Sequence, residues 1–219
     1  MQKKAFSFVL TFLLAFMGMA RADVVTIGEG TSTGYVTPFN SLWGYSCVEQ
    51  IYTANEIGTA GTINSISFNL SSGSQTNQVE VFMKNVTRST FSSTSDYEAL
   101  TASDMVYSGT VTFNTGWTTI TLDTPFAYDG SSNLLIAMHE FTSGYSTIIF
   151  YYTSAANTVV TFHSDSVNPD PYNLGSFSGS SYTSSNRANI QIDITPGGAG
   201  NGTNCTCSSW TVKTWSSTR

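Results

Sequence analysis

One polar segment of the chain combines aromatic rings with oxygen-bearing side chains, the two components of a sugar-binding surface. The apolar C–H face of a sugar ring packs on an aromatic ring, and its hydroxyls pair with carboxylate and amide groups. Residues 165–186 contain both kinds of side chain, and residues 30–45 supply further rings. The predicted ligand-binding residues are Trp43, Tyr45, Tyr172, Phe177 and Tyr182. The alternative is that these rings cover the edge of the fold.

The same segment carries a group of oxygen ligands that calcium prefers. The predicted calcium ligands are Asp165, Asn168, Asp170 and Asn173. Calcium binds carboxylates and amide carbonyls in this way. Asn-Pro and Asp-Pro steps are also ordinary turn sequences, so a turn without metal is the alternative. Calcium is the one cofactor that we expect to be possible.

Three patterns that could support catalysis each lack a required partner. The string Gly30–Gly34 fits G-x-S-x-G, but a serine hydrolase needs a buried strand before it and a helix after it. A zinc protease requires a second His four residues after the first. His139-Glu140 has none at that position, and His163 is the only other histidine. A glycosidase needs two facing carboxylates, and spacing alone brings none together. We therefore predict that the protein is not an enzyme.

The cysteines favour neither a disulfide framework nor a zinc site. The chain has three, Cys47, Cys205 and Cys207, so at least one is unpaired or paired between chains. Cys205 and Cys207 are too close in sequence to form a bridge without strain. Cys47 lies in a strand-like run, where a buried cysteine acts as a small hydrophobic residue.

The central part of the chain shows the pattern that determines the fold class. Apolar residues alternate with Thr over 110–113 and again over 117–123, with a turn expected at 114–116. Residues 134–138 are apolar almost without a break. This pattern predicts three antiparallel strands, the third buried on both faces. In the second strand the polar face holds Thr119, Thr121 and Asp123, and the apolar face holds Ile120 and Leu122.

A sheet of this kind must cover its apolar face, which predicts an all-β fold: a two-sheet antiparallel β-sandwich of about ten strands. The domain should span 23–195, with a flexible Gly/Ser/Thr-rich tail over 196–219. A phase slip between Ile63 and Ile66 indicates a β-bulge. Polar excursions are expected over 87–104 and 165–186.

The N-terminus predicts export. Residues 1–22 form a signal peptide, with a basic start, a short apolar run and the small-x-small pattern Ala20-Arg21-Ala22, cleaved after Ala22. The cleaved chain keeps five basic and 14 acidic residues, a net charge of −9. Such a surface repels nucleic acid and anionic lipid. We expect a secreted or cell-surface protein with no membrane span after the signal.

Several stretches resemble a family of secreted jelly-roll modules from bacterial surface and adhesin-type proteins, related to cleaved adhesins and carbohydrate-binding modules. The matching stretches are residues 49–70, 79–97, 107–138 and 164–179. The resemblance implies a jelly-roll topology and no catalytic motif. We expect an exported binding module for a glycan or a cell-surface protein, acting through loop aromatics. The alternatives are a structural or protein-interaction module and, more remotely, a hydrolase.

Overall fold

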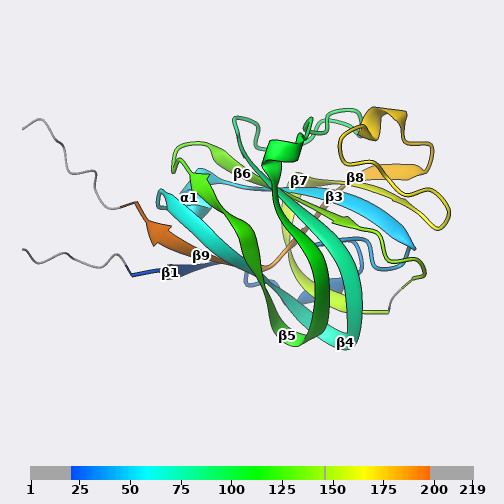
Figure 1. Ribbon diagram of the computed structural model, residues 1–219, viewed down its shortest axis with the longest axis horizontal. Helices are drawn as coiled ribbons and strands as arrows, with labels where there is room; N and C mark the ends of the chain where they lie inside the picture. Colours follow the sequence, from blue (N-terminus) through cyan, green and yellow to red (C-terminus); the bar gives the residue numbers. More distant parts are fainter. Residues whose placement is uncertain (1–20, 146, 198–219) are drawn as a thin grey trace, which may run out of the picture.

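The computed structural model describes residues 21–145 and 147–197, and this part of the chain is built almost entirely from strands (Figure 1). Two 3₁₀ turns, η1 and η2, and one four-residue helix, α1, are its only helical elements. The strands are β1 (Asp23–Ile27), β2 (Ser32–Gly34), β3 (Tyr45–Tyr52), β4 (Gly61–Val86), β5 (Met105–Tyr128), β6 (Asn133–Glu140), β7 (Ile149–Ser164), β8 (Ser180–Ala188) and β9 (Ile190–Pro196). The helical elements are α1 (Ala54–Ile57), η1 (Ala102–Asp104) and η2 (Leu174–Ser176). The predicted all-β fold is confirmed.

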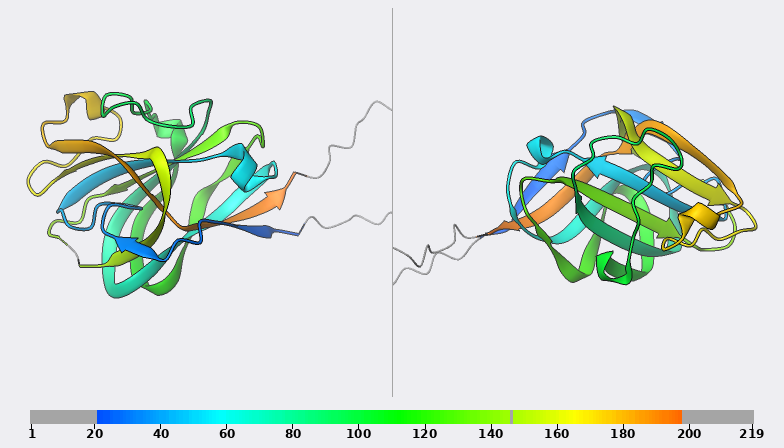
Figure 2. Two further views of the ribbon diagram at one scale, coloured as in Figure 1. Left: turned by 180° about the vertical axis from the view of Figure 1, so that it is seen from behind. Right: turned by 90° about the horizontal axis from the view of Figure 1, so that it is seen from above.

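The nine strands form one antiparallel sheet that curves around a central core. The strand order is β1-β9-β4-β6-β3-β7-β2, with β5 added on β4 and β8 on β7. β4 also pairs with β7, so the sheet folds back toward itself (Figure 2). The finer two-sheet, jelly-roll description stays a prediction.

Strands β4 and β5 make a long bent ribbon, which corrects the turn expected at 114–116. β5 runs for 24 residues without reversing, and both of its halves pair with β4. The register shifts between Leu70 and Ser74, opposite Gly116. Gly73 and Gly116 have φ angles of 96° and 97°, a conformation that glycine adopts without strain. A bulge at this point bends both strands together, where the sequence pattern indicated a hairpin.

Other element boundaries differ from the sequence prediction in the same way. Residues 149–164 form one strand where two were expected, and β2 lies in a segment expected to be irregular. The loop predicted over 165–186 ends early because β8 begins at Ser180 and pairs with β7. The bulge expected near Ile63 is confirmed by a register shift between Ile63 and Ser65.

The core has two parts, one on each side of β3. The larger part lies between the curved strands and includes Phe39, Phe68 and Phe113. The smaller part lies under the 87–104 and 165–179 loops, where Phe91 and Leu174 cover the outer side of β3 (Figures 1 and 2). Cys47 is buried there as a free thiol, as its position in a strand predicted.

Glu49 is a buried acid in this smaller core. Its side chain is fully buried, and Oε2 accepts a hydrogen bond from the Glu98 N–H at 2.8 Å. Oε1 has no hydrogen-bond partner among the described residues. Burial raises the pKa of Glu49 to about 8, because the charged form would lose its hydration. The carboxyl is therefore protonated in the folded protein at neutral pH, and it fixes the 87–104 loop.

This burial predicts a pH dependence of stability. Between pH 4.5 and about 8 the folded chain keeps a proton that the unfolded chain releases, so stability falls as pH rises through this window. The slope from one such proton is at most about 1.4 kcal/mol per pH unit. Urea unfolding at pH 5, 6, 7 and 8 should show that Glu49→Gln removes this contribution. Glu29→Gln, which removes an exposed carboxylate, should keep the wild-type slope; equal slopes in all three proteins would contradict the assignment.

The predicted signal peptide and tail lie almost wholly outside the described residues, and so do Cys205 and Cys207. β1 begins at Asp23, the residue that follows the predicted cleavage site. Within the described residues, no helix has the length and apolar character needed to span a membrane.

Candidate functional site

A pocket opens on the outer face where β4 changes its hydrogen-bonding partner. β4 pairs with β9 as far as Phe68, and with β7 from Leu70. Between these two points, β8 ends at Ala188 on β7 and β9 begins at Ile190 on β4. The single residue between them, Asn189, crosses from one strand neighbourhood to the other. The sheet surface is open at this crossing.

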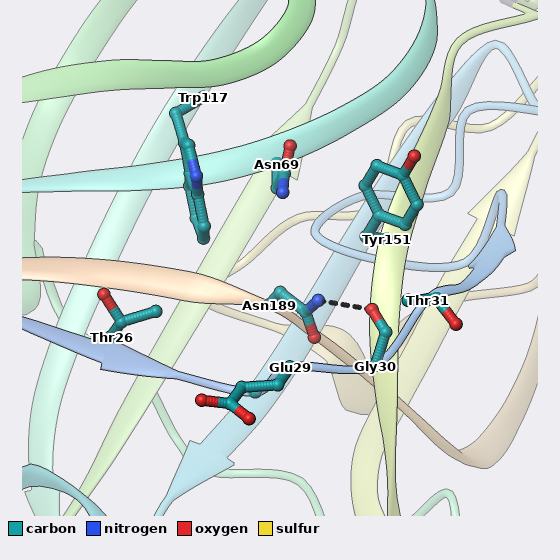
Figure 3. Close-up of a pocket in the computed structure, with 9 residues that line it drawn as sticks. Thr26, Glu29, Gly30, Thr31, Asn69, Trp117, Tyr151 and Asn189 are labelled. Atoms are coloured by element: carbon teal, nitrogen blue, oxygen red, sulfur yellow. Dashed lines mark hydrogen bonds between the residues drawn. The ribbon is translucent and has the colours of Figure 1, made fainter.

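The pocket has a volume of about 520 Å³ and mixes aromatic, amide and carboxylate side chains (Figure 3). Small-molecule sites in proteins span roughly 300–1,000 Å³. Its lining residues are Thr26, Gly28, Glu29, Gly30, Thr31, Asn69, Trp117, Tyr151 and Asn189. They come from β1, the β1–β2 loop, β4, β5, β7 and the β8–β9 junction.

Asn189 builds one wall of the pocket from the inside. Its side chain is buried, its Nδ2 donates to the Gly30 carbonyl at 2.8 Å, and its Oδ1 accepts from Thr153 Oγ1 at 2.8 Å. The Gly30 N–H donates to the same Thr153 oxygen at 2.8 Å. These bonds tie the β1–β2 loop to β7. The loop therefore holds Glu29 at the pocket on a fixed backbone.

Gly28 and Gly30 allow this close approach, and alanine at either should destabilise the protein. A Cβ on Gly30 would lie 2.1 Å from the Tyr152 carbonyl oxygen; one on Gly28 would lie 2.5 Å from Asn189 Oδ1, at a φ of +87°. Forced contacts of this kind cost about 1–3 kcal/mol. Thermal unfolding of Gly30→Ala should show a lower midpoint than wild type. Gly197→Ala, which meets nothing within 4 Å, is the control and should match wild type; an unchanged Gly30→Ala midpoint would contradict the tight loop.

Trp117 and Asn69 face the pocket from the outer side of the ribbon. They are cross-strand partners in the β4–β5 register, so their side chains lie on the same face. The neighbours Phe68 and Leu70 point to the core, which leaves Asn69 on the outside. The Trp117 side chain is 38% exposed, and Figure 3 shows its indole extending over the pocket from the β5 side.

Four side chains at the pocket keep unused binding capacity. The side chains of Glu29, Asn69, Trp117 and Tyr151 make no hydrogen bond within the part of the chain that the structure describes. Figure 3 shows Trp117 and Glu29 on opposite sides of the space, with Asn69 and Tyr151 at its margin. The site therefore offers an aromatic face, an amide, a phenol and a carboxylate to a ligand.

The five predicted ligand-binding aromatics do not form one joint surface. Trp43 and Tyr182 both contact His163, with ring centroids 4.7 and 5.4 Å from the imidazole. Phe177 packs on Phe162, whereas Tyr172 packs edge-on against Phe82. Tyr45 is half-buried at the start of β3, and Tyr182 belongs to strand β8 and not to a loop. Of the five, Tyr172 and Tyr182 are exposed.

The four predicted calcium ligands each make separate contacts. Asp165 Oδ1 accepts from the Gly44 N–H at 3.0 Å, and Asn168 Oδ1 lies 2.7 Å from His139 Nε2. Asp170 Oδ1 accepts from the Tyr172 N–H at 2.9 Å, which is the turn geometry expected for an Asp-Pro step. Asn173 precedes η2, and its carbonyl accepts from Ser176 Oγ. Within the described residues, no three His, Cys, Asp or Glu side chains gather as a metal site would need.

The structure places Gly30–Gly34 and His139, two of the features considered for catalysis, and the buried Cys47 next to His139. Gly30–Gly34 contains strand β2, so the strand-to-helix turn of a serine hydrolase is not formed there. Cys47 and His139 are cross-strand partners, and His139 Nδ1 lies 3.0 Å from Glu80 Oε2. His139 Nε2, however, faces Asn168, and burial raises the pKa of the Cys47 thiol well above its ordinary value. A buried neutral thiol is a poor nucleophile.

None of the pocket residues was among the predicted ligand-binding residues, although the sequence carried a signal for one of them, Trp117. Trp117 has the same strand parity as Thr119, Thr121 and Asp123, the face predicted to be polar. A large aromatic ring on the wet face of a strand is a candidate for ligand contact. Glu29, Asn69 and Tyr151 carried no such signal, because only the crossing at Asn189 brings them together.

Comparisons of the chain with family models, with curated proteins and with solved structures find no match in any of the three.

Proposed function

We propose that this protein is an exported, non-catalytic binding module that holds a glycan in the Trp117 pocket. The observation that carries the proposal is the exposed indole beside an amide, a phenol and a carboxylate that have no partner within the described chain. An aromatic ring receives the apolar face of a sugar, while the polar groups pair with its hydroxyls. The proposal moves the binding site from the predicted loop aromatics to the strand face.

A polar row beside the pocket supports a ligand longer than one sugar. Thr26, Gln191 and Ser67 are successive cross-strand neighbours on β1, β9 and β4, and Thr119 of β5 follows Ser67. Ser67 and Thr119 already share a hydrogen bond of 2.8 Å. Because strand side chains alternate, this row is on the same face as Asn69 and Trp117. Further sugar units would find hydroxyl and amide partners along it.

The fold and the resemblance to secreted adhesin-type modules support a role in surface attachment. An open site in which one indole extends over the space gives modest affinity, and useful adhesion would depend on many copies acting together. Predicted loop aromatics that pack against other rings, such as Phe177 on Phe162, contribute to the smaller hydrophobic core. A structural module without a small ligand remains the competing function, and the following experiment separates the two.

A glycan array probed with the purified protein tests the proposal. We expect a restricted set of saccharides to bind, and Trp117→Ala to remove that binding while Tyr172→Ala leaves it. Loss of binding in Tyr172→Ala with retention in Trp117→Ala would return the site to the loop aromatics. Flat binding across the array, with or without calcium, would favour the structural module.

A further inference from the structure

The Trp117 pocket carries a negative charge that nothing in its lining balances. Glu29 supplies a carboxylate, and none of the lining residues is Lys, Arg or His. Most cations in the described chain are engaged elsewhere: Lys84 with Glu98, Arg88 with Asp96 and Glu98, and Arg187 with Glu56. A ligand entering the pocket therefore meets an aromatic face on one side and a carboxylate without a basic partner on the other (Figure 3).

The position of Glu29 is set by the protein backbone. Gly28 and Gly30 on either side are packed too tightly against β7 and the β8–β9 junction to accept a Cβ. The Asn189 side chain also holds the Gly30 carbonyl. A carboxylate on a loop anchored in this way loses little freedom on binding, which favours its use in recognition.

We propose that the pocket selects saccharides that carry a free amino group and discriminates against acidic ones. The ammonium of an amino sugar pairs with Glu29 while the sugar ring lies on Trp117, and the indole face adds attraction for the cation. A uronate or another acidic sugar brings its carboxylate to Glu29 with no basic side chain in the lining to receive it. This inference rests on the proposed glycan-binding function and assigns its ligand class.

The solvent exposure of Glu29 limits how strongly the pocket can prefer amino sugars to neutral ones. Glu29 is exposed to solvent, so its pairing with an ammonium is screened by water and salt. Exposed ion pairs of this kind change an equilibrium by up to about fivefold at low salt. We therefore expect amino sugars to bind about threefold to fivefold more tightly than neutral ones, with acidic sugars weaker still.

The test is calorimetric titration of the protein with β-1,4-linked hexamers of glucosamine, N-acetylglucosamine and glucose, and with a hexamer of galacturonate, at 20 mM and 500 mM NaCl. We expect the glucosamine hexamer to bind most tightly at low salt and galacturonate most weakly. High salt should narrow the difference. Glu29→Gln should bring the glucosamine and glucose hexamers to equal affinity without abolishing binding.

Matched variants separate this selection from general attraction to an acidic protein. Asp104→Asn removes one negative charge away from the pocket and should keep the wild-type order, whereas Trp117→Ala should lose binding of all four. The charge selection is overturned if Glu29→Gln keeps the wild-type order of affinities for the four hexamers. It is also overturned if Asp104→Asn loses the preference for glucosamine as fully as Glu29→Gln does. Neither result contradicts glycan binding itself. If no hexamer binds and the glycan array is also flat, the proposed function falls and the selection falls with it.

Discussion

Replacing Trp117 with alanine is expected to reduce glycan affinity by about tenfold to a hundredfold. Truncating the central aromatic residue of a binding site typically costs about 2 kcal/mol or more, and each 1.4 kcal/mol is a factor of ten. The indole is the one large aromatic face among the pocket residues that extends over the space (Figure 3). Titration calorimetry with the best ligand from the array measures the loss directly.

The same substitution should leave the fold intact. Trp117 lies on the outer face of β5 and is not part of either hydrophobic core. Surface changes of this kind shift stability by only about 0.5 kcal/mol. Tyr145→Ala removes a ring that is 72% exposed and does not line the pocket, so it should bind like wild type. If Trp117→Ala binds the glycan with wild-type affinity and unfolds at the wild-type midpoint, the proposed site is wrong.

Replacing Arg187 with alanine is expected to cost about 2–4 kcal/mol of stability. The guanidinium is buried, donates to the Ile51 carbonyl at 2.9 Å, and bonds both carboxylate oxygens of Glu56. It also lies over the Tyr52 ring, 4.7 Å from the centroid. Breaking a buried pair costs about 3–5 kcal/mol. We place this one lower because about a third of the Glu56 side chain is exposed and regains water.

Urea unfolding measures this loss, and a partly exposed ion pair whose cation is not buried provides the comparison. Lys84→Ala breaks a pair with Glu98 in which the lysine side chain is 31% exposed, and it should cost about 1 kcal/mol or less. Arg187→Lys should recover only part of the loss, because an ammonium cannot bond both Glu56 oxygens in the fork geometry. Equal losses of unfolding free energy in Arg187→Ala and Lys84→Ala would contradict the larger contribution that we assign to the Arg187–Glu56 pair.

Glu56 links this pair to acid stability. Burial alone would raise the pKa of its carboxyl. Hydrogen bonds from Arg187 and Thr53 lower the pKa by more than burial raises it, so the pKa lies below its ordinary value. A carboxyl whose pKa is lowered by folding stabilises the folded state at pH values above its ordinary pKa. This contribution is lost as pH falls through the lowered pKa. Glu49 has the opposite sign, because its raised pKa stabilises the fold at low pH and that contribution is lost as pH rises.

Alternation in the sequence correctly indicated most of the strands, since each exposes one face and buries the other. Ile190, Ile192 and Ile194 face the core as their spacing required, and residues 134–138 are buried on both faces of β6. Alternation failed at Gly116, where glycine with positive φ serves a hairpin turn and a bulge equally well. The local residues do not distinguish these, because the choice depends on whether β4 is present to pair with both halves.

The sequence by itself determined an all-β chain with an acidic, weakly charged composition and a buried Cys47, because hydrophobic periodicity and charge are properties of neighbouring residues. Only the tertiary structure brought the residues of the proposed binding site together. Glu29, Asn69, Trp117 and Tyr151 are far apart in the chain and meet where β4 exchanges β9 for β7. Such an exchange depends on pairing between distant strands, which no local pattern encodes.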